Sequence, residues 1–296
     1  MSPRDGAQTV QVAGRTLSVS SLEKVLYPAT GTTKAEVLQY YVQVADRLLP
    51  HLRDRTVTRI RYPQGVAGEH FFEKNLPSGA PSWLPRVEIA GHGSRSGRDR
   101  VTYPLVRDLA DLVFLVNLGS LELHVPQWRV DDDGTVLPPD RMVVDLDPGP
   151  GAGLEECARV ALLVRERLAG LGLDCAPVTS GSKGMQLYAA LDGRRDSEEV
   201  SGVARGLAQQ LSGELPDLVV WRMTRSLRPG KVLLDWSQNS SAKTTICPWS
   251  LRGRPHPTVA APRTWDEVQD AADGHRALEQ VPFALALERP AGELAT

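Results

Sequence analysis

The sequence predicts a mixed α+β fold, because segments with helical periodicity alternate with short apolar segments typical of strands. The clearest helical patterns lie at residues 34–49, 154–171 and 198–211. The sequence contains no internal repeat, heptad pattern or long low-complexity linker. At 296 residues, the chain suits either one large domain, 1–296, or two closely packed lobes.

The helix predicted at 34–49 has a defined start and a defined apolar face. Thr33 and Glu36 have the spacing of a capping box, in which each side chain satisfies a backbone N–H group of the first turn. The apolar side chains that then recur at helical spacing are Val37, Tyr40, Tyr41, Val44 and Leu48. Both signals therefore predict the same helix.

A strand, a turn, a helix and a second strand follow one another in the middle of the chain. The apolar strand at 142–146 carries carboxylates and stops at a Pro-Gly-Pro-Gly turn. The helix at 154–171 is closed by Gly170 and Gly172, and the next strand begins at 177–179. This order predicts a βαβ-like unit.

Shorter elements complete the predicted fold. Strands are expected at 123–125, 185–191, 218–221 and 232–235, and a late helix at 265–272. The segment 91–100, rich in Gly, Ser and Arg, is predicted to be an exposed loop, and 282–296 a loosely held tail. A polar turn at 131–134 marks the expected boundary if the chain forms two lobes, 1–130 and 131–296.

The composition is that of a soluble protein, with 41% hydrophobic and 24% charged residues. No apolar run approaches the roughly 20 residues that a membrane-spanning helix requires. The N-terminus lacks the apolar core of a secretory signal, and the cysteines are odd in number and without Cys-x-x-Cys spacing. We therefore expect a cytoplasmic protein with no membrane partner.

Positive charge is concentrated in one stretch of an almost neutral chain. Residues 222–254 hold seven basic side chains and one acid, a local charge of +6. Because the net charge of the whole chain is −2, the remaining residues together carry −8. Clustered Lys and Arg attract phosphate groups, so this stretch predicts a localised anion-binding surface. Its basic residues are Arg222, Arg225, Arg228, Lys231, Lys243, Arg252 and Arg254.

Two aspartates share one face of a predicted strand. Asp145 and Asp147 lie two residues apart, so repulsion between them is relieved only by protonation or by a hard cation such as Mg²⁺ or Mn²⁺. A solvated strand end gives the same pattern, so the pair alone leaves both interpretations open. Asp235 ends the apolar run 231–234 in the same way. Three carboxylates at one sheet edge can hold two metal ions for phosphoryl transfer.

Three further patterns allow both a structural and a functional interpretation. In the Ser-Gly-Ser-Lys-Gly segment at 180–184, amides, hydroxyls and a lysine can face a triphosphate, although a plain hairpin turn has the same composition. The segment lacks Walker A spacing. His124 is either a structural strand histidine or a substrate contact. Phe71 and Phe72, near Lys74, either stack on bases or contribute to the core.

Taken together, these segments resemble the polymerase domain of the bacterial non-homologous end-joining ligase, ligase D, in the archaeo-eukaryotic primase superfamily. The resemblance covers nearly the whole chain and includes seven ordered motifs. They are Lys24-Val25-Leu26-Tyr27-Pro28 with Thr32-Thr33-Lys34, Phe71-Phe72-Glu73-Lys74, Leu121-Glu122-Leu123-His124, Val144-Asp145-Leu146-Asp147-Pro148-Gly149, Thr179-Ser180-Gly181-Ser182-Lys183-Gly184, Ser226-Leu227-Arg228-Pro229-Gly230-Lys231, and Asp235-Trp236-Ser237-Gln238-Asn239 to Ser250-Leu251-Arg252-Gly253-Arg254.

The resemblance implies a primase-like fold with mixed and antiparallel central sheets flanked by helices. It implies that Asp145, Asp147 and Asp235 are catalytic and bind two ions, Mn²⁺ or Mg²⁺, with an NTP or dNTP as substrate. The implied nucleotide-binding residues are His124, Ser180, Lys183, Arg228, Gln238 and Arg252. The implied DNA-binding residues are Lys24, Lys34, Arg61, Phe71, Phe72, Lys74 and Arg254, with Lys24 and Lys34 on a 5′-phosphate.

The implied activity is addition of ribo- or deoxynucleotides to DNA 3′ ends, for gap filling and end bridging during double-strand break repair. Expected partners are DNA ends with a 5′-phosphate, Ku and a DNA ligase. The protein is expected to be nucleoid-associated and monomeric, or dimeric across two synapsed ends. Ser21 stands where the family commonly has Asn, which predicts a weaker 5′-phosphate pocket, and Ile60 separates Arg59 from Arg61 in a basic pair.

Two other functions fit parts of the sequence. A DNA-end-binding and synapsis module with weak or dispensable polymerase activity would use Lys24, Lys34 and the basic stretch equally well, but would not need three aspartates. A glycosyltransferase would use Asp145 and Asp147 and leave the other motifs unexplained. The chain has no Lys-x-Asp-Gly adenylation motif, so it is expected to be a stand-alone polymerase or a domain of a longer ligase.

Overall fold

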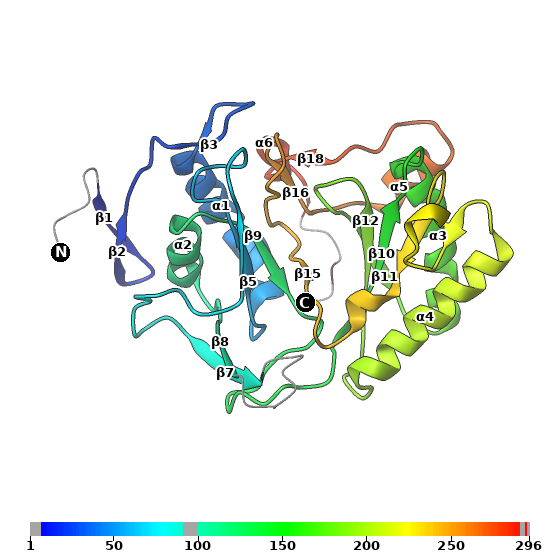
Figure 1. Cartoon of the computed structure of the whole chain (residues 1–296), viewed down its shortest axis with the longest axis horizontal. Coiled ribbons are helices and arrows are strands. Elements are labelled where there is room, and N and C mark those ends of the chain that lie inside the picture. The colour runs from blue at the N-terminus through cyan, green and yellow to red at the C-terminus, as the bar shows by residue number, and fades with distance from the viewer. Residues whose placement is uncertain (1–6, 91–99, 291–293, 295–296) are drawn as a thin grey trace.

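The computed structural model describes residues 7–90, 100–290 and 294. Two β-sheets form the centre of the molecule, and helices cover the outer side of each, as Figure 1 shows. No helix in these described ranges is long and apolar enough to cross a membrane. The predicted α+β class with mixed and antiparallel sheets flanked by helices is confirmed.

The first sheet is antiparallel and has the strand order β15-β9-β5-β6. Its strands are β15 (Thr245–Ile246), β9 (Ser120–Val125), β5 (Thr58–Arg61) and β6 (Phe71–Glu73). Its helices are α1 (Lys34–Leu52) and α2 (Leu109–Asn117). Buried residues of both helices and of β9 share one apolar core.

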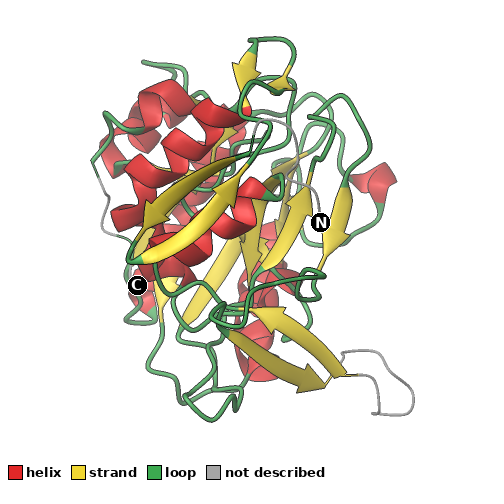
Figure 2. Cartoon of the chain, turned by 90° about the vertical axis from the view of Figure 1, so that its left-hand side faces the viewer, coloured by secondary structure: helices red, strands yellow, loops and turns green. Residues whose placement is uncertain are grey.

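Three hairpins extend this half of the molecule. They are β1 (Gln8–Val12) with β2 (Arg15–Val19), β3 (Val25–Tyr27) with β4 (Thr32–Thr33), and β7 (Arg86–Ala90) with β8 (Arg100–Pro104). The β7–β8 hairpin has its own small core around Trp128 and lies away from the helices (Figures 1 and 2). Of the exposed loop predicted at 91–100, only Arg100 lies within the described residues, and it begins β8.

Helix α1 begins where the sequence predicts and ends later. Thr33 and Glu36 form the capping box, with the Thr33 N–H donating to the Glu36 carboxylate at 2.7 Å. The predicted end at residue 49 is three residues short, because Pro50 lies inside the last turn. His51 and Leu52 are buried, so packing holds this turn in the helix despite the proline.

The second sheet has six strands in the order β13-β14-β10-β12-β11-β17. Its strands are β13 (Val219–Val220), β14 (Val232–Asp235), β10 (Arg141–Pro148), β12 (Met185–Ala190), β11 (Cys175–Thr179) and β17 (Ala261–Pro262). Its helices are α3 (Leu154–Gly170), α4 (Ser197–Glu214) and α5 (Trp265–Ala272), and short 3₁₀ turns lie at Arg225–Leu227 and Trp236–Asn239.

The two faces of β10 have different surroundings. Met142, Val144 and Leu146 pack with α3, α4 and α5 in the second core. Side chains of a strand alternate between faces, so Asp145 and Asp147 point to the opposite face. In Figure 1 that face is turned toward the first sheet.

The predicted βαβ-like unit is present in a split form. Strands β10 and β11, joined by α3, are both antiparallel to β12, which lies between them. The two strands therefore run in the same direction without pairing with each other. The sequence order alone does not reveal this insertion, because β12 comes later in the chain.

The loosely held tail predicted from residue 282 is wrong for the described residues up to 290. Strand β18 (Val281–Pro282) pairs with β16 (Thr258–Val259), and helix α6 (Phe283–Ala286) follows. The Phe283 ring packs edge-on against Tyr40 at 5.8 Å, and Ala286 is fully buried. Aromatic and apolar contacts with α1 thus hold this segment against the first core.

The C-terminal residues connect the two sheets. The turn at 131–134 lies where the chain passes from β9 to β10, but β15 returns to pair with β9. Trp249 is fully buried in the first core, and its carbonyl accepts a hydrogen bond from the Tyr40 hydroxyl at 2.8 Å. Strand β17 then returns the chain to the second sheet.

Candidate active site on one face of the second sheet

The register of two neighbouring strands brings the three predicted aspartates together. Strands β10 and β14 are antiparallel, and Asp145 lies directly opposite Asp235. Asp147 lies two residues further along β10, on the same face as Asp145. The three acids are thus brought together as predicted, but on the face of the sheet rather than at its edge, because β14 and β10 are interior, antiparallel strands.

The surroundings of Asp145 make its ionisation costly. Burial, together with the nearby charges of Asp235 and Asp147, raises the pKa of this carboxyl group to about 7. A hydrogen bond from Gln186, at 3.1 Å, acts in the opposite direction. Tyr188 in turn donates to the Gln186 side chain at 3.0 Å. The hydrogen bonds from Tyr188 to Gln186 and from Gln186 to Asp145 therefore orient the Asp145 carboxylate.

The other two aspartates have close partners. Asp147 lies 3.2 Å from the Lys183 ammonium and 3.3 Å from the Arg228 guanidinium. Asp235 accepts hydrogen bonds from the Ser237 amide and hydroxyl on one oxygen, and from Gln238 on the other at 3.0 Å. Arg228 and Gln238, both predicted nucleotide-binding residues, are therefore in contact with the aspartates.

The chemistry of this cluster suits hard divalent cations. Carboxylate oxygens are the ligands that Mg²⁺ and Mn²⁺ prefer, and a cation would offset both the burial of Asp145 and its repulsion by Asp235 and Asp147, which keep its pKa high. Across the described residues, however, no three Asp, Glu, His or Cys side chains already surround one point as metal ligands would. Asp147 and Asp235 are instead directed toward the partners given above.

A cavity of about 300 Å³ opens above the aspartates. Its walls come from β9, β10, β12, the loop after β11 and the residues that follow β14 and β15. Most of the predicted site residues line it: His124, Asp145, Asp147, Ser180, Lys183, Asp235, Gln238, Arg252 and Arg254. Arg254, predicted to bind DNA, thus lies with the nucleotide-binding set, where it donates to the Ser182 hydroxyl at 2.5 Å.

The loop at 180–184 is both a hairpin turn and a wall of this cavity. The Ser180 amide donates to the Gly184 carbonyl at 2.9 Å, which closes the turn between β11 and β12. Gly181 has φ +70°, and a Cβ atom on Gly184 would lie 2.1 Å from the Leu146 carbonyl oxygen. The glycines are therefore required by backbone conformation and close approach. The exposed Lys183 side chain extends from this loop toward Asp147.

A buried carboxylate holds two of the predicted nucleotide-binding residues in place. Glu122 is 4% exposed and lies 2.9 Å from the His124 ring and 3.3 Å from the Arg252 guanidinium. It also accepts from the Gly253 amide at 2.8 Å and from the Tyr62 hydroxyl. Burial raises the pKa of Glu122, but the hydrogen bond with His124 and the charge of Arg252 outweigh it and lower the pKa to about 2.

Sequence reasoning missed several residues that shape the site. Glu122 had a signal, because it shares a strand face with His124. No local sequence pattern indicated the roles of Gln186 and Asn239, because these roles depend on contacts between distant segments. Asn239 is buried and forms hydrogen bonds with both the amide and the carbonyl of Val143, which fixes the turn after Asp235 against β10.

The two lysines predicted to bind a 5′-phosphate lie in the first half of the molecule. Lys24 donates to the Pro63 carbonyl at 2.5 Å and to the Gln64 side chain at 2.8 Å. Lys34 is buried and donates to the Ser20 carbonyl and, at 2.8 Å, to Asn117. Neither lysine lines the cavity above the aspartates.

Ser21 has φ 56°, in the left-handed region where Asn is more favourable than Ser. The asparagine that the family commonly has there therefore suits the backbone of this turn. The expected weakening of the 5′-phosphate pocket by Ser21 stays a prediction.

The remaining predicted DNA-binding residues gather on and beside the edge strand β6. Phe71 and Phe72 are 47% and 58% exposed, so of the two interpretations left open, the one that places a phenylalanine in the core does not hold. The Lys74 ammonium lies 6.0 Å from the Phe72 ring. Arg61 forms an ion pair with Glu73 at 2.7 Å. Two exposed aromatic rings next to cations suit stacking on nucleic-acid bases.

The fold and the site together define a protein of the primase-polymerase class. The family model described as "LigD, primase-polymerase domain" matches residues 33–290. The chain therefore belongs to the LigD primase-polymerase family.

Relatives over most of the chain are end-joining proteins. The chain is 52% identical over 259 residues to "Multifunctional non-homologous end joining protein LigD" of Mycolicibacterium smegmatis, covering 88% of the chain and 33% of the relative. It is 33% identical over 256 residues to "Bifunctional non-homologous end joining protein LigD" of Bacillus subtilis, covering 86% and 40%. The chain thus spans about a third of the length of these curated relatives.

A solved structure has the same fold. The polymerase domain from Mycobacterium tuberculosis ligase D, in complex with DNA, superposes with a TM-score of 0.86 at 45% sequence identity. The match covers 92% of this chain and 93% of that one. The primase-like fold implied by the sequence motifs is therefore confirmed.

Proposed function

We propose that this domain is a metal-dependent polymerase that adds ribo- or deoxynucleotides to DNA 3′ ends during non-homologous end joining. The observation that carries the proposal is the cavity in which the aspartates Asp145, Asp147 and Asp235 face Lys183 and Arg252. Carboxylates opposite basic groups on one face of a sheet suit a site where metal ions and a triphosphate bind together. Membership of the primase-polymerase family supports the same reaction.

The three aspartates would hold two Mn²⁺ or Mg²⁺ ions. When bound, such ions activate an attacking hydroxyl and stabilise a leaving oxygen. The chain's own contribution is to orient the acids: Gln186 holds Asp145, and Ser237 and Gln238 hold Asp235. Because the pKa of Asp145 is raised by burial, we expect cation binding to release a proton near neutral pH.

Basic and hydroxyl groups on the opposite wall would bind the triphosphate. Lys183 and Arg228 neutralise Asp147 here, and a nucleotide would give them phosphate oxygens as further partners. Arg252 and His124 are held by Glu122, so they enter the reaction already oriented. Ser180 and the loop backbone complete the anion-binding wall.

DNA would bind through residues of the first half of the molecule. Lys24 and Lys34 would hold a 5′-phosphate, and Phe71 or Phe72 would stack on a template base. The similar mycobacterial domain was solved in complex with DNA, which supports DNA binding by this domain. Ku and a DNA ligase are the proposed partners, because the relatives are named as end-joining proteins. We propose a nucleoid-associated monomer that dimerises across synapsed ends.

Primer extension on a gapped, 5′-phosphorylated duplex tests the proposal. The wild type is expected to extend the primer with Mn²⁺, more strongly with ribonucleotides, and Asp145→Asn/Asp147→Asn is expected to abolish extension. Asp132→Asn/Asp133→Asn, a matched change at two exposed aspartates, should extend normally. If the wild type binds the duplex in a phosphate-dependent manner without extending it, the domain is an end-binding module instead.

A further inference from the structure

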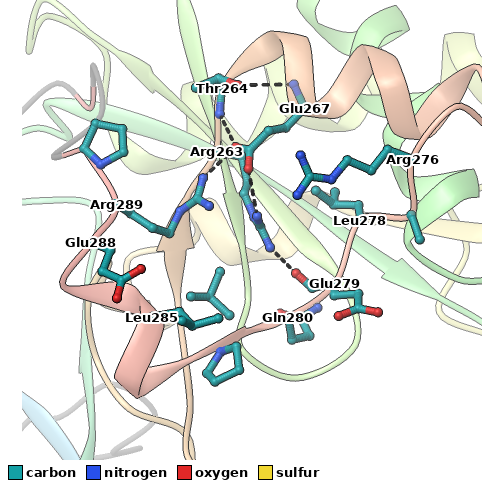
Figure 3. A pocket seen from close by; sticks show the side chains of 14 residues that line it. Arg263, Thr264, Glu267, Arg276, Leu278, Glu279, Gln280, Leu285, Glu288 and Arg289 are labelled. Carbon is teal, nitrogen blue, oxygen red and sulfur yellow. Dashed lines mark hydrogen bonds and ion pairs between the residues drawn. The ribbon is translucent and has the colours of Figure 1, made fainter.

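A second cavity, of about 740 Å³, lies between α5 and the segment 276–290 (Figure 3). Arg263 lines this cavity and connects the segment 276–290 to the second sheet through hydrogen bonds. Its guanidinium donates to the Glu279 carbonyl, to Glu267 at 3.0 Å and to the Thr179 hydroxyl at 3.3 Å. Arg289 forms a second ion pair with Glu267 at 2.6 Å. The backbone at residue 279 is therefore anchored to the end of β11.

The next residue, Gln280, extends from this anchored backbone to the loop at 180–184. Its side-chain carbonyl accepts a hydrogen bond from the Gly181 amide at 2.6 Å. Its side-chain amide donates to the Gly184 carbonyl at 3.0 Å. One side chain thus connects both glycines of the loop, although Gln280 lies almost 100 residues away in the chain and does not line the active-site cavity.

The loop at 180–184 depends on hydrogen bonds from other segments, because its glycines allow its backbone to adopt several conformations. Gly181 has φ +70°, a region that glycine enters and leaves easily. Thr258 donates to the Gly181 carbonyl, so that peptide unit is held on the other side as well. Lys183, with 62% of its side chain exposed, has few contacts of its own, and its position depends on the backbone that carries it.

We propose that Gln280 is a positioning residue that holds the triphosphate-binding loop in its active shape. It acts through the loop, so that Ser180 and Lys183 face the aspartates before a nucleotide arrives. The inference rests on the proposed function, because it assigns Gln280 to nucleotide binding by that same site. Without Gln280, nucleotide binding would have to order the loop, which weakens affinity.

Single-nucleotide addition by Gln280→Leu measures the effect on the reaction. Leucine has a similar size but forms neither hydrogen bond. The Michaelis constant for the nucleotide is expected to rise roughly tenfold, the equivalent of about one neutral hydrogen bond, with kcat within about twofold. Gln269→Leu, a matched change on α5 at an exposed side chain that donates a hydrogen bond to Asp273, should leave both constants unchanged. An unchanged Michaelis constant in Gln280→Leu overturns the inference.

Hydrogen exchange at the Gly181 amide tests the inference without activity. This amide is expected to be protected in the wild type, because it donates to Gln280, and to exchange at least tenfold faster in Gln280→Leu. Exchange at the unprotected rate in the wild type would refute the role of Gln280 even if the variant does not fold. Failure of the wild type to add nucleotides, with Gly181 protected, would instead refute the proposed function.

Discussion

We expect the Glu122 carboxylate to make the stability of the protein depend on pH in the acid range. Its pKa of about 2, against an ordinary value of 4.5, corresponds to roughly 3 kcal/mol of folding free energy at neutral pH. Because the folded-state pKa is lowered, this stability is fully present above about pH 4.5 and is lost as the pH falls toward 2. Roughly 2 kcal/mol of it should disappear between about pH 5 and pH 3.

Glu122→Gln replaces the ionisable carboxyl group with an amide of the same size. The variant is expected to be less stable than the wild type by about 3 kcal/mol at pH 7, and to converge with it as the pH falls. Its nucleotide Michaelis constant should also rise, since His124 and Arg252 lose their common partner. Urea unfolding at a series of pH values measures the free energy of unfolding for both proteins.

Glu166→Gln provides the matched control for this experiment. Glu166 lies on the surface of α3, with 70% of its side chain exposed, and forms an ion pair with its neighbour Arg167. This variant should follow the wild type at every pH. If Glu122→Gln lost stability with falling pH as steeply as the wild type, another group would be responsible and the assignment to Glu122 would be wrong.

Three further changes test how the site and its supporting elements are built, each by thermal or urea unfolding. Gly184→Ala places a Cβ atom 2.1 Å from the Leu146 carbonyl oxygen and should lower the free energy of unfolding by about 3 kcal/mol. The control Gly170→Ala, whose Cβ atom meets no neighbouring element within 4 Å, should lose no stability, and equal stabilities of the two variants would contradict this packing. Thr33→Ala removes the helix cap and should cost about 1 kcal/mol, and no loss would mean that the first turn has other partners. Asn239→Ala leaves a buried amide and carbonyl of β10 unpaired and should cost roughly 2–3 kcal/mol, so a loss below about 0.5 kcal/mol would show that water replaces the side chain.

Local patterns predicted those parts of the fold that depend on neighbouring residues. The capping box at Thr33 and the apolar period after it identified α1, because both signals lie within a few turns of each other. Pairing between distant segments was not predictable. The insertion of β12 between β10 and β11, and the ordered segment after residue 281, depend on contacts that no local pattern records.

The candidate site shows the same division. The three aspartates were predicted to meet because Asp147 and Asp235 each end an apolar run and Asp145 shares a strand face with Asp147, and the register places Asp145 opposite Asp235. Their supporting residues were not identified from local patterns, since Gln186 and Gln280 form their contacts across 41 and 99 positions of the sequence. A glutamine carries no distinctive pattern, so its role appears only once the backbone brings its partners within reach.

The return of the C-terminal residues to the first sheet has a consequence for synthesis. The ribosome makes α1 and β9 long before Trp249, which fills the core between them, and before β15, which completes the sheet. The nascent first half therefore emerges with an unfilled core and an unpaired strand edge. Domains ordinarily fold from the N-terminus as they emerge. The first half therefore has to avoid aggregation until β15 and Trp249 have been translated.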